Sequence, residues 1–427
     1  MRGLAVSAAN YALLRIRGEG KHTKNWRPQL LILMKPDKAL FPSHPQMLSF
    51  AAQLKAGKGI TLVNTVLEGD YIERAVEGRA AKMILNDFMD GYGVRGFTQV
   101  VTSPDVIQGL THCIQTAGLG KLRHNTVMIG WPSHWTDDPD QSARFLSVLQ
   151  AIATANLSLM VAKGVDGFPE STDRLTGTID VWWIVHDGGM LLLLAFLLQQ
   201  NPTWKHCTLR IFTIAQLEDN SVQLKRDIEK YLYHLRIKAN VTVVELVDSD
   251  ISAYIYERTL QMEERSKLIQ NMRLKKHASK NQLQDIVDNA HSQRDFIETL
   301  EPLEDVLEET EPVPVIGVLS AVDVPSSERI QYTYSNITQL RRETYYKQPQ
   351  RKPDKKNVRK MHTAIELNKH IASLSKEAEI VIVNMPSFPT TPCNNENYMT
   401  FLEVLTEGIE RVLMVRGSGQ EVITIYS

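Results

Sequence analysis

The chain has 427 residues, 43% of them hydrophobic, which is enough for two or three ordinary domains with a substantial core. Its formal net charge is −1 at pH 7, so the chain as a whole is not an electrostatic binder of nucleic acid or of anionic membranes. The longest apolar run, residues 190–198, is shorter than the roughly 20 residues that cross a bilayer, and three scattered cysteines indicate neither a disulfide framework nor a zinc site.

Strands and helices alternate through the first part of the sequence. Apolar strands are predicted at residues 29–34, 60–67, 97–102, 126–130 and 157–163. Helices are predicted between them at residues 44–54, 72–90, 104–117 and 141–156. This alternation is typical of a doubly wound α/β unit, in which helices cover both faces of a mainly parallel sheet. We assign the unit to residues 29–172, after a connector or helix at residues 1–28.

The same pattern begins again at about residue 177. Strands are predicted at residues 181–185, 209–214, 241–247 and 379–385, followed by paired strands at 411–415 and 421–426. Helices are predicted at residues 190–199, 221–237, 364–375 and 398–409. The fold class is therefore α/β, with two tandem doubly wound subdomains that form a structural pseudo-repeat, and the second subdomain spans residues 173–427.

A long insertion interrupts the second subdomain. Residues 252–274 continue as a charged helix, whereas residues 276–356 lose periodicity and include an acidic stretch at 298–311. Low hydrophobicity and blocks of like charge cannot offset the entropy lost on ordering, so we predict that most of the insertion is disordered. The apolar residues 315–322 could still pair as an isolated strand.

A basic run precedes a single threonine near the end of the chain. Residues 341–360 contain nine Lys or Arg residues and lead into Thr363, which Glu366 follows three positions later. This spacing fits a capping box, in which each side chain bonds the other residue's backbone amide at a helix N-terminus, with the cap worth about 1 kcal/mol. A phosphate on Thr363 would add a charge of about −1.5 to −2, which a helix N-terminus favours. Both interpretations can hold together.

Three short motifs hint at anion binding, and each has a simpler explanation. Residues 91–96 match the dinucleotide fingerprint but lie between a helix and a strand, which favours a helix-terminating loop. Residues 53–59 suggest a phosphate loop but lack the Walker pattern, so a connector is favoured. His186 and Asp187, with two glycines after them, follow a strand and could hold an anion. Helix capping by Asp187 is the favoured interpretation.

Long runs of sequence resemble a known family. Residues 357–364 (Asn-Val-Arg-Lys-Met-His-Thr-Ala) and 419–427 are similar to the C-terminal cytosolic part of the potassium-chloride cotransporters, within the cation-chloride cotransporter family. Further similar runs lie at residues 24–31, 53–59, 180–189 and 250–254, so only about 275–350 does not match well. The resemblance implies a cytosolic regulatory domain of an electroneutral potassium-chloride symporter, not an enzyme, at the cytoplasmic side of the plasma membrane.

The resemblance also implies partners and regulation. The domain would act on a transmembrane transport domain outside this chain, form a homodimer, and respond to a Ser/Thr kinase and a phosphatase in chloride and cell-volume homeostasis. The family's second inhibitory phosphorylation site maps onto Thr363. The first falls near residues 286–288, where Val287 replaces the threonine, with Ser279 and Thr299 as nearby substitutes. Tyr398 is a further candidate, although its helical spacing with apolar neighbours favours packing.

The family's cytosolic part is associated with ATP bound in its first subdomain. Carried over by position, that pocket would use Leu33, Lys35, Ser43, His44, Val66, Gly130 and Trp131. Lys35 can pair with a phosphate, and Trp131 can stack on an adenine or form a wall of its pocket. Relatives carry a Lys-Tyr pair where this chain has Ser43 and His44, so we expect a weakened or lost ATP site and no required cofactor.

Two other function classes remain open. A nucleotide-dependent α/β enzyme would use Lys35, His186 and Asp187, and it predicts turnover by this chain alone. A scaffold would recruit partner proteins through the charged residues 298–360, and it predicts partner binding through that segment. The missing Walker and nucleophile-elbow motifs disfavour the enzyme.

Overall fold

The computed structural model describes residues 2–15, 27–54, 59–120, 122–133, 135–184, 189–215, 220–246, 355–389, 395–419 and 421. All of them belong to one compact unit, which combines residues 1–262 with residues 355–427. The predicted charged helix, acidic stretch and apolar segment of the insertion lie outside the described residues, as does the predicted strand 421–426 except for Glu421. The first described element, α1 (Arg2–Arg15), exposes its apolar side chains.

The first half of the unit contains five strands with helices between them. The strands are β1 (Leu30–Met34), β2 (Thr61–Glu68), β3 (Phe97–Ser103), β4 (Thr126–Gly130) and β5 (Ser158–Lys163). The helices are α2 (Gln46–Leu54), α3 (Ala75–Gly91), α4 (Val106–Thr116) and α5 (Pro139–Thr154), and the short helix η2 (Val165–Gly167) follows β5. Every residue of β1 is buried, as expected for an apolar strand in a sheet covered on both faces.

The second half repeats this arrangement. Its strands are β6 (Thr178–Trp183), β7 (Thr208–Ala215), β8 (Asn240–Glu245), β9 (Ile380–Asn384) and β10 (Val412–Arg416). Its helices are α6 (Met190–Gln200), α7 (Ser221–Leu235), α11 (Lys355–Ser375) and α12 (Asn395–Leu405). The sequence predicted α11 only from residue 364, and that boundary is wrong. Lys, Arg and Met favour helix, so the basic residues from Lys355 to Lys360 belong to α11 instead of preceding it.

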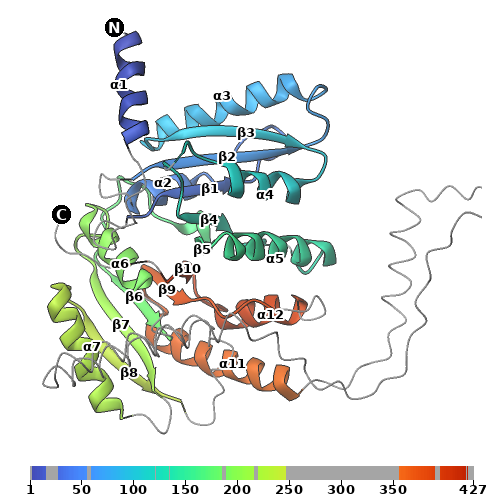
Figure 1. Ribbon diagram of the computed structural model, residues 1–427. Coiled ribbons are helices and arrows are strands. Elements are labelled where there is room, and N and C mark those ends of the chain that lie inside the picture. The colour runs from blue at the N-terminus through green and yellow to red at the C-terminus, as the bar shows by residue number, and fades with distance from the viewer. Residues whose placement is uncertain are drawn as a thin grey trace, which may run out of the picture. The chain divides into compact units, whose positions relative to one another are not determined.

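The two halves join into one ten-stranded sheet, in the order β3-β2-β1-β4-β5-β10-β9-β6-β7-β8 (Figure 1). Each half therefore has the same order, with its third strand at the outer edge and its fifth strand at the join. Neighbouring strands are parallel within each half, and only β5 and β10 pair antiparallel. The mainly parallel, doubly wound α/β fold is confirmed. The sequence did not predict that the two halves join edge to edge through β5 and β10.

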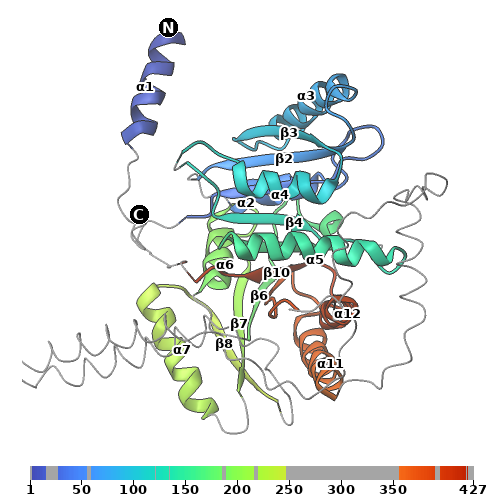
Figure 2. The same cartoon turned by 45° about the vertical axis from the view of Figure 1, so that its right-hand side comes forward.

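Among the described elements, four helices cover each face of this sheet. One hydrophobic cluster includes apolar side chains of α2, α3, α6 and α7, and the other includes those of α4, α5, α11 and α12. At the join, α2 packs against α6 on the first face and α5 packs against α12 on the second. Figure 2 shows α11 beside α12, in agreement with their packing contacts. The join thus has a helix pair on each side.

The repeat extends to single hydrogen bonds after the fourth strand of each half. The amide of Trp131 donates to the carbonyl of Ala162 at 2.8 Å, and the amide of Met385 donates to the carbonyl of Val415 at 2.8 Å. A proline and a serine follow both Trp131 and Met385. The two halves are therefore related by an approximate two-fold axis between β5 and β10.

Candidate functional site

The residues predicted to bind a nucleotide gather where the strand order of the first half reverses. Leu33 is the next-to-last residue of β1 and pairs in parallel register with Ile129 of β4. Lys35 follows the end of β1, Gly130 ends β4, and Trp131 comes next. Ligands of doubly wound sheets bind at this kind of switch point, outside the carboxyl ends of the strands. The structure therefore places these predicted residues together at the switch point outside the carboxyl ends of β1 and β4, which we call the β1/β4 crevice.

The loop between β1 and α2 carries the other polar candidates. The amide of Ser43 donates to the carbonyl of Lys35 at 2.9 Å, and both side chains are exposed. His44 lies beside Gly130, because a Cβ added to that glycine would be 3.8 Å from His44 Cδ2. The Nδ1 atom of His44 is 3.1 Å from the carboxylate of Asp166. Lys35 is therefore available to an anion, whereas His44 already has a carboxylate partner.

Leu33, Val66 and Trp131 belong to the same buried cluster. The methyl groups of Val66 lie against Gly109 of α4, where an added Cβ would be only 2.4 Å from Val66 Cγ1. Val66 is on β2, the neighbour of β1. These apolar side chains are therefore part of the hydrophobic core next to the ends of β1 and β4.

Trp131 is surrounded by protein groups. Its ring is in edge contact with Phe145, with centroids 5.7 Å apart, and Lys163 Nζ lies 5.5 Å from its centroid. Its indole N–H donates to Glu403 Oε2 at 3.1 Å, and the residue is 7% exposed. A stacked adenine would have to displace one of these neighbours. Nucleotide binding stays a prediction.

A polar cluster at the join, which sequence reasoning missed, surrounds Glu403 of α12. Lys163 Nζ donates to Glu403 Oε1 at 2.7 Å and to Thr406 Oγ1 at 2.7 Å. The indole of Trp135 donates to Glu403 Oε2 at 3.2 Å, beside that of Trp131. We call these five residues the Glu403 clasp. No sequence signal could have found it, because α12 and β5 are far apart along the chain.

The clasp sets the ionisation of its carboxyl group. Partial burial raises the pKa of Glu403, but the hydrogen bond and charge of Lys163 and the two indole N–H groups outweigh burial. The pKa therefore lies below its usual value, and Glu403 is ionised at neutral pH. The carboxylate accepts hydrogen bonds from three side chains of the first half while belonging to the second half.

Thr363 lies inside α11, not at its N-terminus. The side chain is fully buried, and its hydroxyl donates to the carbonyl of Arg359 at 3.1 Å. The carboxylate of Glu366 bonds Lys369 Nζ at 2.7 Å. The predicted capping box is therefore wrong, since the helix begins at Lys355 and the Thr363 amide lies in the helix interior.

The buried face of α11 packs on α12. Thr363 and its neighbour Ala364 are fully buried, as are Leu367 and Ile371 further along the same face. The side-chain amide of Asn368 donates to the carbonyls of Leu405 and Glu407, at 3.1 and 2.9 Å. Asn368 thereby satisfies orphan carbonyls at the C-terminal end of α12. A change at Thr363 thus occurs on a helix that is bonded to α12.

Tyr398 packs in the core, as the sequence favoured. Its ring is in edge contact with Phe388, and its hydroxyl donates to the carbonyl of Pro386 at 2.9 Å. Burial raises the pKa of this tyrosine. The tyrosine is therefore part of the packed core, where its hydroxyl bonds a backbone carbonyl.

The chain matches the sequence pattern of Solute carrier family 12 over residues 44–174, 168–303 and 317–427. These segments cover most of the sequence. The chain belongs to solute carrier family 12. This agrees with the resemblance seen in the sequence at the level of the family.

This solute carrier family 12 chain is similar, at low identity, to solved structures. The crystal structure of the cytoplasmic domain of a prokaryotic cation chloride cotransporter is 11% identical, covers 92% of this chain and 97% of its own, and has a TM-score of 0.43. A putative universal stress protein from Pseudomonas aeruginosa UCBPP-PA14 is 8% identical, with coverages of 93% and 96% and a TM-score of 0.39.

The short motifs of this solute carrier family 12 chain fall mostly at connections. In the segment 91–96, α3 ends at Gly91 and Gly93 has a φ of +66°, so the helix-terminating loop is confirmed. Gln53 is buried at the end of α2, and the four residues after Leu54 lie outside the described residues. His186, Asp187, Ser279, Val287 and Thr299 also lie outside the described residues.

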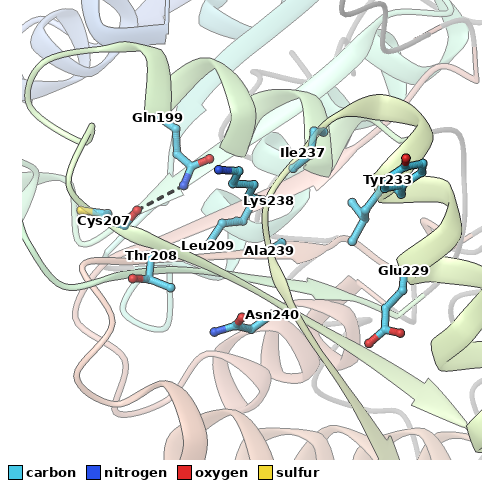
Figure 3. Close-up of a pocket in the computed structure, with 11 residues that line it drawn as sticks. Gln199, Cys207, Thr208, Leu209, Glu229, Tyr233, Ile237, Lys238, Ala239 and Asn240 are labelled. Carbon is cyan, nitrogen blue, oxygen red and sulfur yellow. Dashed lines mark hydrogen bonds between the residues drawn. The ribbon is translucent and has the colours of Figure 1, made fainter.

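A cavity of about 570 Å³ lies elsewhere, at the amino ends of β7 and β8 (Figure 3). Leu209, Ile237 and Ala239 line it together with Lys238 and Asn240, and no predicted site residue takes part. Cys207 also lines the cavity, and burial raises the pKa of its thiol to about 11, so the thiol is protonated at neutral pH. In the described part of the chain, no group of three His, Cys, Asp or Glu side chains could hold a metal ion.

None of the helices in the described ranges is long and apolar enough to cross a membrane.

Proposed function

We propose that this chain is a cytosolic regulatory domain of an electroneutral potassium-chloride symporter, and that phosphorylation of Thr363 inhibits transport. The match to solute carrier family 12 supports a role in ion transport. The buried position of Thr363 within α11 supports the regulatory role. No residue of this chain is assigned to binding the transported ions.

The observation that carries the proposal is the complete burial of the Thr363 side chain between α11 and the core. A phosphate carries about two negative charges and needs solvent or cationic partners. It cannot stay in a closely packed apolar interface, because burying an unpaired charge is very costly. Phosphorylation therefore shifts α11 from its packed position to a displaced one, which provides a two-state element of the kind that a phosphate can bias.

When α11 is displaced, its basic side chains can pair with the phosphate. Arg359 and Lys360 lie within one helical turn of Thr363, and His362 is next to it. Once the threonine side chain is in solvent, these groups can pair with the phosphate and hold α11 in its new position.

The test is chloride-dependent uptake of a potassium analogue by cells expressing the transporter that includes this domain. Thr363→Ala should raise flux and Thr363→Glu should lower it, at equal surface expression. Ile365→Glu is the matched control, because Ile365 lies on the exposed face of the same helix and should change flux little. Equal flux in wild type and in both Thr363 variants would reject inhibition through this residue.

Two parts of the proposal extend beyond Thr363. The domain forms a homodimer and works at the cytoplasmic face of the plasma membrane, where a kinase and a phosphatase reach it. ATP bound at the β1/β4 crevice is at most weak, because Ser43 offers no cation and the Trp131 ring is already in contact with Lys163 and Phe145. Calorimetric titration with ATP tests this part, and submicromolar affinity would contradict it.

A further inference from the structure

Thr363 and the loop after β4 are connected through helix α11, helix α12 and the Glu403 clasp. The series of contacts begins on α11, where Asn368 bonds the carbonyls of Leu405 and Glu407 at the end of α12. It continues on α12, where Glu403 and Thr406 bond Lys163 of β5. The series ends at Trp131 and Trp135 in the first half of the unit.

The final contacts are the two indole N–H groups. Trp131 and Trp135 both donate to the Oε2 atom of Glu403, at 3.1 and 3.2 Å. Trp131 directly follows β4, so the carboxylate of an α12 residue holds the loop at the β1/β4 crevice. The other oxygen of Glu403 is bonded to Lys163 at 2.7 Å. The carboxylate therefore cannot move without breaking contacts to both indoles and to the ammonium group.

We propose that Glu403 is a positioning residue that couples the α11–α12 helix pair to the loop following β4, so that displacement of α11 at Thr363 rearranges the β1/β4 crevice. The proposal rests on the function proposed above for Thr363. Asn368 transmits the displacement of α11 to α12, and the Glu403 clasp transmits the movement of α12 to Trp131 and Trp135. Coupling is reciprocal, so release of the clasp loosens α11 as well.

The partially exposed position of the clasp suits this role. The side chain of Lys163 is 16% exposed and that of Glu403 is 42% exposed, so water can replace lost partners at moderate cost. A fully buried ion pair would resist separation, because each freed charge would remain without solvent. The clasp can therefore open and close when α12 shifts.

The first arm of the test uses the 427-residue chain with ¹⁵N-labelled tryptophan. The indole resonances of Trp131 and Trp135 are assigned with Trp→Phe variants. Thr363→Glu should move both resonances and leave that of Trp204 in place, because Trp204 bonds Gln53 on the opposite face of the sheet. Asn368→Ala alone should leave all three in place, but in combination with Thr363→Glu it should largely abolish the movement.

The second arm does not require a charge at position 363. Glu403→Gln should speed amide hydrogen exchange in α11 by about tenfold, the size of a typical coupling between sites. Glu396→Gln is the matched control, since Glu396 is exposed on the first turn of the same helix and no side-chain contact of it is part of the clasp. Equal exchange in wild type, Glu403→Gln and Glu396→Gln would overturn the coupling.

The two proposals fail in different ways. If Thr363 variants change ion flux but leave the Trp131 and Trp135 resonances unmoved, the coupling through Glu403 is overturned and the regulation stands. If the resonances move and flux does not, the coupling is supported and the function proposed for Thr363 is contradicted.

Discussion

Lys163 and Glu403 lie 2.7 Å apart across the join between the two halves, although 240 residues separate them along the chain. The pair connects β5 with α12, close to the only antiparallel pairing among the described strands. Sheet hydrogen bonds alone would leave the helices on this face free to shift. The ion pair and its indole partners fix α12 against the first half.

Lys163→Met should destabilise the chain by about 1–2 kcal/mol, because the apolar stem is kept while two charge-assisted hydrogen bonds are lost. Arg144→Met is the matched control, since Arg144 pairs with Asp140 at 3.9 Å on the surface. That variant should cost less than about 0.5 kcal/mol. Urea denaturation measures both, and equal losses would show that the clasp contributes no more than a surface pair.

The stability contributed by Glu403 should depend on pH. Its folded-state pKa is below the usual 4.5, so the folded state binds fewer protons than the unfolded state as pH falls through 4.5. The contribution is present above pH 4.5 and is lost below it. The difference in unfolding free energy between wild type and Glu403→Gln should therefore shrink as pH is lowered through that range. A difference that stays constant would contradict the assignment.

His124 should make the chain less stable in mild acid. The residue is 6% exposed, and burial lowers the pKa of its imidazole below 6.5. Below pH 6.5 the unfolded chain takes up a proton that the folded chain excludes, so stability falls as pH falls. His124→Gln should remove this component from the pH dependence of urea unfolding. His112 is exposed, and His112→Gln should leave the profile unchanged.

Thr363→Glu should destabilise the chain by about 3 kcal/mol or more, because the Thr363 side chain is fully buried and a longer, charged side chain at this position has to be removed from water. Thr363→Val keeps the shape and loses one hydrogen bond, at a cost of about 1 kcal/mol. Ile365→Glu, on the exposed face, should change stability by about 0.5 kcal/mol or less. If Thr363→Glu were tolerated as well as Ile365→Glu, the buried position of Thr363 would be wrong.

The sequence predicted local structure well where that structure depends on residues within a single helix, strand or loop. The apolar run at residues 29–34 led to β1, and the chain ends the α3 helix at the glycine-rich segment 91–96, as the loop interpretation required. These features depend on residues that are near each other in the sequence. The doubly wound arrangement followed from their alternation.

What the sequence could not predict depends on distant parts of the chain. The sequences of β5 and β10 do not by themselves predict that these strands pair antiparallel. The residues near Trp131 in the sequence do not indicate that Glu403 is its hydrogen-bond partner. The start of α11 was missed for a different reason. The Thr363–Glu366 spacing was interpreted as a helix N-terminus, whereas packing of Ala364 and Leu367 in the core stabilises a longer helix.

The most direct measurement is amide hydrogen exchange of this chain with Thr363 stoichiometrically phosphorylated, compared with the unmodified chain. We predict faster exchange in the phosphorylated chain throughout α11 and at the C-terminal end of α12, where Asn368 bonds the carbonyls of Leu405 and Glu407. Exchange in α3, on the opposite face of the sheet, should stay the same. Unchanged exchange in α11 would show that the phosphate is accommodated without displacing the helix. That result would contradict the proposal that phosphorylation of Thr363 displaces α11.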